Sequence, residues 1–562
     1  MQEISFKDKF RYRFDNVMAK GPVALIGGLF LLTILILLVV SVILAVTGLV
    51  PPDEGKAVGF FELMWMNLMR LMDAGAVGGD KGSWPFLLMM LFTTFAGIFV
   101  FSMLIGILTS GLESKLEELR KGRSLVVEND HTVILGWSER VFSILSELAI
   151  ANESNPGACV AILADKDKVE MEDEIKGRVE LGKMRVVCRN GNPLQLSDLG
   201  VINLHASKAI ILLAPEESSD PDSYMIKAIL AITNNPKRRK EPYHIVATIK
   251  DPRNHSVAKM VGKDEVEVVL ADSFISRLAV QTCRQTGLSV VYQELLDFDG
   301  DDIYFKEEPS LTGKTFRDAV FAYDKSALMG LRLKNGGIVL NPPPETVLAA
   351  GDKVIALTED DSTLLLSNKR DFPIDAAALR EAVVRERKPE KTLILGWNKN
   401  ATTVINELDD YVTAGSEIAI YATTPEAEEQ IAENCISLQN LKFSFTLADT
   451  TDRGVLEALR PQDYDYIMTL GYSDDLDPQD ADAKTLLTLL HLRDMASRAG
   501  LNFSIVSEML DANNRELAQI AQVDDFIVSD KFISLMLSQI AENKELNQLF
   551  ADLLKAEGNE IY

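Results

Sequence analysis

The sequence has little of what a catalyst or a disulfide-stabilised protein needs. Only four of its 562 residues are cysteine. They are scattered without metal-ligand spacing, which favours a reducing compartment over a disulfide framework. Histidine occurs five times, and no two histidines have metal-ligand spacing. No Ser/His/Asp or Cys/His set is evident, so the sequence argues against an enzyme.

Positive charge is also scarce, because 57 Lys and Arg stand against 83 Asp and Glu, a net charge of −26. Residues 1–123 hold 12 basic and 11 acidic residues, so the acidic surplus lies in the rest of the chain. This sign makes nucleic acid a poor partner and cations reasonable ligands. The simplest reading of most of these carboxylates is solubility.

Two long stretches carry no charge, 22–50 and 84–112. Each exceeds the ~20 residues that cross a bilayer as a helix. The first is too long for the apolar part of a signal peptide and lacks a small-residue cleavage site. Basic residues flank the outer ends of both stretches, so the positive-inside rule places both termini in the cytoplasm. We therefore expect a multi-pass protein of the lipid bilayer.

Between these stretches, a half-length apolar run (57–72) is followed by a Gly-rich loop (73–83). This pattern is typical of a re-entrant pore helix, because non-helical backbone lies at membrane depth only where protein buries it or water reaches it. Two helices per chain cannot enclose a passage, so we expect a homotetramer. The predicted filter and pore residues are Met72, Asp73, Ala74, Gly75, Ala76, Val77 and, in an outer vestibule, Asp80.

Asp73 is predicted to form a ring of carboxylates at the negative end of the pore helix, so the mouth should favour cations. The TVGYG signature of potassium filters is absent, and strong potassium selectivity is not expected. The alternative for Asp73 and Asp80 is ordinary loop residues. In the second span, Gly97 and Gly106 either allow close helix packing or act as gate hinges.

The rest of the chain contains an internal repeat. HTVILGWSERVFSILSEL begins at His131 and KTLILGWNKNATTVINEL at Lys391, and YHIVATIKDPRN later parallels FSIVSEMLDANN. Short apolar runs alternate with helical patterns in both copies, which predicts two Rossmann-like α/β lobes with parallel, doubly wound sheets. Such sheets bind ligands at the carboxyl ends of their strands.

The expected boundaries follow from these patterns. They are 1–20, N-terminal segment; 21–50, first span; 51–83, pore helix and filter loop; 84–112, pore-lining span; 113–128, gating linker; 129–298, first Rossmann-like lobe; 299–370, small α+β lobe with a hairpin at 335–337; 371–390, charged linker; and 391–562, second Rossmann-like lobe.

A dinucleotide site needs G-x-G-x-x-G after the first strand. Only the first glycine is present, as Gly136 and, in the second copy, Gly396. Trp137 occupies the region where backbone would approach a pyrophosphate. Asp165 ends the next strand, where a ribose-binding acid belongs, but its counterpart in the second copy is not acidic. NAD or another nucleotide is therefore not favoured.

Several longer motifs resemble the Castor/Pollux channels, which are cation channels of plant nuclear envelopes with bacterial relatives. These motifs are LRKGRSLVVENDHTVILGW from Leu119, CRNGNP from Cys188, and FDGDDIYF from Phe298. The resemblance implies a tetramer with two RCK (regulator of potassium conductance) modules per subunit, arranged in a gating ring of eight. It also implies calcium-sensitive gating and permeation of potassium or calcium. The chain departs from the plant members in having only two convincing spans and a loosely similar filter loop, which weakens the inference on ion selectivity most. As a bacterial relative of the family, it is expected in the plasma (inner) membrane of a prokaryote.

Calcium prefers several carboxylate and carbonyl oxygens, which leads to a set of candidate ligand-binding residues. None of them forms an EF-hand loop, and the alternative interpretation of each cluster is an ordinary solvated surface. The candidates are Asp165 and Asp167, Glu216 and Glu217 (these four as metal ligands), Asp474, Asp475 and Asp477, together with Gly136, Trp137 and Asn192.

Two alternatives stay open at this point. One is a membrane-tethered, nucleotide-binding regulator of ion transport that conducts nothing itself. The other is a subunit of a potassium uptake system with separate regulator chains, against which the fused pore segment counts.

Overall fold

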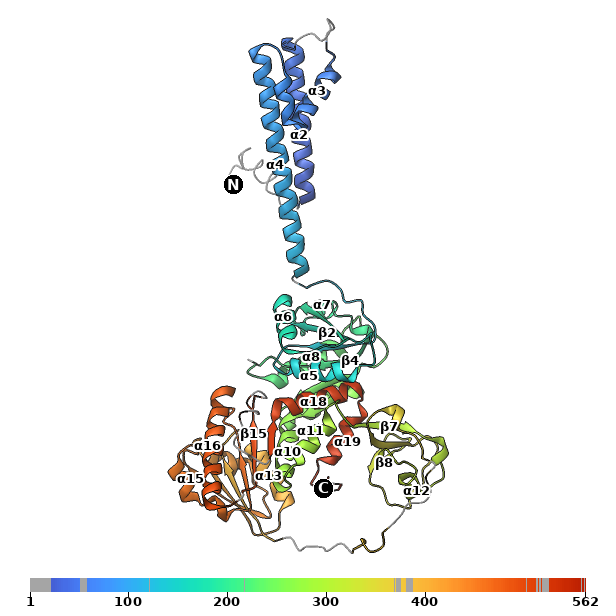
Figure 1. Cartoon of the computed structure of the whole chain (residues 1–562), viewed down its shortest axis with the longest axis vertical. Helices are drawn as coiled ribbons and strands as arrows, with labels where there is room; N and C mark the ends of the chain where they lie inside the picture. Colours follow the sequence, from blue (N-terminus) through green and yellow to red (C-terminus); the bar gives the residue numbers. More distant parts are fainter. Residues whose placement is uncertain are drawn as a thin grey trace, which may run out of the picture. The chain divides into compact units, whose positions relative to one another are not determined.

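The structure is a computed structural model that describes residues 22–50, 58–120, 122–216, 218–367, 369, 375–380, 388–501, 503–511, 514, 517, 525–556, 558–559 and 561. The predicted N-terminal segment 1–20, Glu217, positions 51–57 and most of the linker 371–390 lie outside the described residues. The chain divides into two compact units, Met1–Gly122 and Arg123–Tyr562 (Figure 1).

The first unit contains the helices α2 (Pro22–Thr47), α3 (Phe60–Met72) and α4 (Trp84–Arg120), with the 3-10 helix η1 (Ala74–Gly79) after α3. Within the described part of the chain, two helices are long and apolar enough to cross a membrane, over Val23–Thr47 and Trp84–Glu113. At 1.5 Å per residue, the 13-residue α3 is too short to cross. Helix α4 also extends beyond the predicted end of the second span at 112.

A polar pair fixes α3 against α2. Asn67 Nδ2 donates to Ser41 Oγ at 3.0 Å, and both residues are buried among apolar side chains such as Val40, Leu63 and Met90. In hydrocarbon an unmade hydrogen bond is costly, so this pair specifies where the two helices meet.

The second unit begins with a six-stranded parallel sheet of order β3-β2-β1-β4-β5-β6. Its four inner strands are largely apolar runs buried on both faces, as expected where helices cover both sides, and the edge strands β3 and β6 are partly exposed. The strands are β1 (His131–Leu135), β2 (Cys159–Ala164), β3 (Arg185–Asn190), β4 (Ser207–Leu212), β5 (Ile245–Ile249) and β6 (Val266–Leu270). The helices are α5 (Arg140–Ala151), α6 (Lys168–Arg178), α7 (Leu196–Leu199), α8 (Pro221–Thr233), α9 (Pro252–Gly262), α10 (Ala271–Arg284) and α11 (Leu288–Leu296). We call this part module 1.

Module 2 repeats the plan with the order β13-β12-β11-β14-β15-β16. Its strands are β11 (Lys391–Leu395), β12 (Ser416–Ala422), β13 (Leu441–Leu447), β14 (Tyr466–Thr469), β15 (Ile505–Met509) and β16 (Asp525–Val528). Its helices are α13 (Ala401–Tyr411), α14 (Ala427–Asn434), α15 (Arg453–Leu459), α16 (Pro478–Ala499), α18 (Ser529–Glu542) and α19 (Glu545–Leu553). The predicted pair of doubly wound lobes is confirmed.

The repeat extends to single hydrogen bonds. In module 1, Asp222 accepts from the backbone N–H groups of Lys250 and Asp251 at 2.9 and 3.0 Å. In module 2, Asp482 accepts from those of Leu510 and Asp511 at the same distances. Both carboxylates bind the turn after the fifth strand, at the edge where the ligand crevice of such sheets lies.

A small antiparallel lobe of order β7-β10-β8-β9 lies between the modules in sequence. Its elements are β7 (Asp302–Glu307), α12 (Phe316–Val320), β8 (Ala327–Arg332), β9 (Ile338–Leu340) and β10 (Lys353–Thr358). The expected hairpin is the β8–β9 pair, whose turn places Gly336 at φ +94°.

Each module packs one of its helices against a helix of the other module. Helix α10 of module 1 packs on α13 of module 2, and α18 of module 2 packs on α5 of module 1 (Figure 1). Matching ion pairs join them, Arg140–Asp530 at 2.8 Å and Lys399–Asp272 at 3.2 Å. One apolar core runs through both modules at this junction, so movement of one module acts on the other.

Candidate functional site

The predicted filter loop starts where α3 ends. Asp73 is the C-terminal cap of α3, with extended backbone, and its Oδ1 accepts from the Gly75 N–H at 2.8 Å. Met72 and Asp73 are exposed within the single chain. The backbone of Ala74–Gly79 turns in the 3-10 helix η1, while the side chains of Ala74, Ala76 and Val77 lie outside the described part. Their role in a filter stays a prediction.

Asp80 differs from the expected outer-vestibule carboxylate. Its side chain is 5% exposed and pairs with Arg70 of α3, whose Nε lies 3.0 Å from Asp80 Oδ2. Arg70 Nη1 also donates to the Met66 carbonyl at 3.3 Å. The ion pair joins α3 to the far end of the loop and balances the Asp80 charge.

The two glycines of α4 have different surroundings. A Cβ at Gly97 would lie 2.2 Å from the carbonyl oxygen of Leu71, so this glycine lets α4 approach the end of α3. Its place is explained by packing and needs no hinge. Gly106 has open space around it, and a hinge there stays a prediction.

In both modules, the glycine after the first strand serves the turn itself. Gly136 has φ +108°, and a Cβ there would lie 1.9 Å from the Leu213 carbonyl oxygen. Gly396 has φ +93°, with 2.1 Å to the Leu470 carbonyl oxygen. Both positions need glycine because of backbone conformation and the adjacent strand.

Carboxylates of the chain itself cover the turn at which a Rossmann fold holds phosphate. Glu216 accepts from the Glu139 N–H at 2.5 Å, just before α5. Asp474 accepts from the Lys399 N–H at 2.6 Å, just before α13. A pyrophosphate at either helix start would meet a negative group there.

The remaining candidates have local structural partners. Trp137 packs edge-on against Phe142 at 5.6 Å between ring centroids, and Asp165 is an exposed residue after β2. Asp167 caps α6, Asp477 caps α16, and Asn192 Oδ1 accepts from the Leu194 N–H at 2.8 Å within a turn. Asp475 accepts from Thr424 Oγ1 at 3.1 Å, a contact between segments that are distant in sequence.

These contacts bear on calcium, which takes six to eight oxygen ligands. Among the described residues, no three His, Cys, Asp or Glu side chains are grouped so that they could hold a metal ion. The described candidates do not form a ready-made calcium set within one chain, because most of their carboxylates already accept backbone N–H groups.

Sequence reasoning expected ligands at the carboxyl ends of the strands and named Glu216, but it missed the other residues of the crevice that lies beside β1, β4 and β5 in module 1. It is a cavity of about 210 Å³ lined by Ser138, Arg140, Thr248, Lys250 and others. Burial lowers the pKa of Lys250, and the nearby Lys399 of module 2 lowers it further.

Module 2 fills the corresponding place with Glu508, the counterpart of Thr248. Its carboxylate accepts from Asn398 Nδ2 at 2.7 Å and Ser529 Oγ at 2.9 Å. Burial raises the pKa of Glu508 against the lowering effect of these bonds. One signal for this was present in the sequence, an acidic residue inside an otherwise apolar central strand.

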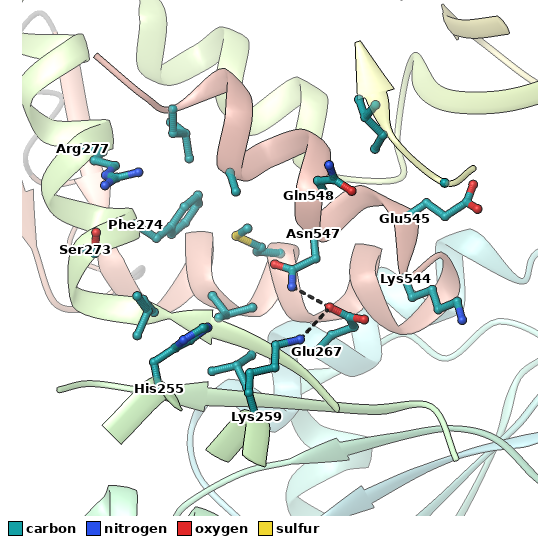
Figure 2. Close-up of a pocket in the computed structure, with 18 of the residues that line it drawn as sticks. His255, Lys259, Glu267, Ser273, Phe274, Arg277, Lys544, Glu545, Asn547 and Gln548 are labelled. Atoms are coloured by element: carbon teal, nitrogen blue, oxygen red, sulfur yellow. Dashed lines mark hydrogen bonds and ion pairs between the residues drawn. The ribbon is translucent and has the colours of Figure 1, made fainter. Parts of the chain in front are cut away.

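A larger cavity of about 540 Å³ lies where module 1, the small lobe and α19 meet. Figure 2 shows Lys259 and Asn547 directed at Glu267; the Asn547 Nδ2–Glu267 Oε2 distance is 2.8 Å. Across this cavity, Arg332 pairs with Glu545 at 2.5 Å. These pairs hold the C-terminal helices to module 1 and to the lobe.

Residues 272–372 match a family model described as Castor and Pollux, part of voltage-gated ion channel. The ion channel CASTOR of Lotus japonicus is 30% identical over 599 residues, a match that covers 100% of this chain and 69% of that protein. This chain belongs to the Castor/Pollux family of ion channels. The probable ion channel POLLUX of Oryza sativa subsp. japonica is 29% identical, with 100% of this chain and 60% of that protein covered.

The fold of this Castor/Pollux chain is also similar to that of a solved gating ring. The human SLO3 gating ring matches with a TM-score of 0.53 at 12% identity, covering 76% of this chain and 84% of that one. This likeness shows the fold of tandem RCK modules. Family and fold together indicate a channel subunit and confirm the resemblance seen in the sequence.

The predicted plasma membrane of a prokaryote is wrong. The Castor/Pollux relatives from Lotus japonicus, Oryza sativa and Arabidopsis thaliana are plant proteins. Apolar spans and flanking charges predict a membrane protein and its orientation, and they carry no information on the host.

Proposed function

We propose that this chain is a subunit of a ligand-gated cation channel, in which the first unit lines the pore and the RCK modules form the gating ring. One observation carries this proposal. The short helix α3 ends at the exposed carboxylate of Asp73 and is followed by a loop that contains no α-helix, only the 3-10 helix η1. In sequence, α3 lies between two helices long enough to span a bilayer. Backbone of this kind is tolerated at membrane depth beside water or within protein.

Two helices per chain enclose no water-filled passage, so several chains must contribute, and we propose a tetramer because four chains around an axis is the usual solution for this topology. Asp73 supports cation preference, since it adds its charge to the negative end of α3. The Asp80 charge is balanced by Arg70, so Asp73 is the carboxylate left to face ions. We expect potassium and other cations to pass without strong selectivity among them.

Ligand control requires that the ligand bind open and closed rings with different affinity. Calcium is the proposed regulatory ligand because of the family resemblance. Since the described part of one chain offers no grouped set of ligands, a calcium site would need oxygens brought together in the assembled ring.

The test is reconstitution of the pure full-length protein in planar bilayers with a KCl gradient. We expect currents that reverse near the potassium equilibrium potential and change when calcium is added on the ring side. A chain ending at Gly122 should conduct without this calcium response. Absence of current from the folded, pure protein would favour the alternative of a nucleotide-binding regulator without conduction.

A further inference from the structure

The two modules share their sheet order and their turns but differ inside one crevice. In module 2, Glu508 lies in β15 with its side chain in the crevice, where it accepts from Asn398, Ser529 and, at 3.4 Å, the Gly471 N–H. In module 2, a side chain of the chain itself therefore occupies the crevice.

Module 1 has smaller groups at the same three positions. Thr248 replaces Glu508, Ser138 replaces Asn398 and Ala271 replaces Ser529. A cavity of about 210 Å³ results, with Ser138 and Thr248 in its lining. Ser138 is 7% exposed, and its Oγ is buried without a hydrogen-bond partner among the described residues. Such a group indicates a missing partner, because native structures rarely leave buried polar atoms unpaired.

The acidic and basic side chains of this crevice differ in whether they already have a partner within the chain. The acids do: Asp222 binds backbone N–H groups, Glu216 binds the Glu139 N–H, and Asp530 pairs with Arg140. Lys250 lines the same cavity, and no described acid forms an ion pair with its ammonium group. Module 2 has the apolar Leu510 at this position.

We infer that the module 1 crevice binds a small molecule with a carboxylate or phosphate group, whose oxyanion takes the place that the Glu508 side chain takes in module 2. Ser138 donates to the oxyanion from one wall and Lys250 supplies the positive charge. The cavity is smaller than the ~300 Å³ at which sites for drug-sized ligands begin. It therefore suits a short carboxylate or inorganic phosphate, and a dinucleotide is too large for it.

The same crevice lies at the junction between modules. Asp530 of α18 lines it, and Lys399 of module 2 lies close enough to Lys250 to lower its pKa. An anion between these two cations would relieve their repulsion and draw the modules together. This consequence for gating rests on the proposed channel function, whereas the binding itself does not.

Module 2 provides the design of the control variant, because it has the same fold and shows which side chains occupy the crevice. The test is calorimetric titration of the full-length protein in detergent with sodium phosphate and sodium malonate, against sodium chloride at equal ionic strength. We expect one oxyanion site per chain in the wild type. The triple variant Ser138→Asn, Thr248→Glu, Ala271→Ser should lose at least ~10-fold in affinity, equivalent to about 1.4 kcal/mol.

Lys250→Leu provides a second variant that leaves the cavity open and removes the charge. It should weaken binding by ~10-fold or more, as expected for a lost charge-assisted hydrogen bond. Equal affinity in wild type and in both variants would overturn the inference, as would a wild type that binds neither oxyanion at millimolar concentration. Bilayer currents test the channel separately, so failure of either proposal leaves the other standing.

Discussion

At the scale of single residues, the backbone conformation at Gly136 and the strand beside it require glycine. Alanine there would put a Cβ 1.9 Å from the Leu213 carbonyl oxygen at φ +108°. We expect Gly136→Ala to lower the free energy of unfolding by about 2–4 kcal/mol, through strain and overpacking. The matched control is Gly177→Ala in α6, where the new methyl meets open space. Chemical unfolding should show no loss for Gly177→Ala, and equal losses would refute the close approach.

Glu147 of α5 predicts a pH dependence of stability. Burial, with a smaller contribution from the nearby Asp297, raises its pKa to about 7 against the lowering effects of the Phe298 N–H bond and Lys531. The folded chain thus holds a proton that the unfolded chain has lost, so the contribution is complete below pH 4.5 and lost as the pH rises through about 7.

Glu147→Gln should remove part of this decline, because the amide keeps an acceptor for the Phe298 N–H without the buried charge. The measurement is the thermal midpoint of the full chain at pH 5.5 and pH 8. We expect the thermal midpoint of the variant to exceed that of the wild type only at pH 8. The same difference at both values would speak against titration of this carboxyl.

At the scale of elements, the Arg70–Asp80 pair ties the pore helix to the end of its loop. Both side chains are largely buried, so Asp80→Asn leaves an unpaired arginine. We expect a stability loss of about 3 kcal/mol, as for other broken buried pairs. Asp73→Asn is the control, since Asp73 is exposed and asparagine still accepts from Gly75.

The two variants should differ in their effects on thermal stability and on ion preference. Thermal denaturation in detergent should be affected by Asp80→Asn and barely by Asp73→Asn. Reversal potentials in a KCl gradient should show weaker cation preference for Asp73→Asn. The opposite pattern would mean that Asp80, and not Asp73, faces the ions.

The architecture of these elements follows from local patterns in the sequence. Continuous apolar runs such as CVAILA predict buried parallel strands, and the GW turns at Gly136 and Gly396 predict the duplication. The partners of single charges do not follow from such patterns. The Glu216 cap on the Glu139 N–H and the Arg70–Asp80 pair depend on contacts between segments separated along the chain.

At the scale of the molecule, the two duplicated modules share one apolar core, and in the proposed channel they follow the helices that would line the pore. Because α18 of module 2 packs on α5 of module 1, and α10 of module 1 packs on α13 of module 2, we expect the two modules to move together. The two crevices differ, because Glu508 occupies the one in module 2 and a cavity of about 210 Å³ lies in module 1. The proposed small ligand would therefore have one site per chain, at the junction between the modules.

The central claim is that the loop after α3 faces an aqueous passage for cations. The most direct measurement is block of single-channel current in Asp73→Cys by a charged, membrane-impermeant thiol reagent. The four native cysteines are all buried, so the wild type should be unaffected. We predict prompt, irreversible block of Asp73→Cys, and no block of Phe61→Cys, at an exposed position near the start of α3. Unchanged currents in Asp73→Cys after treatment would contradict the account.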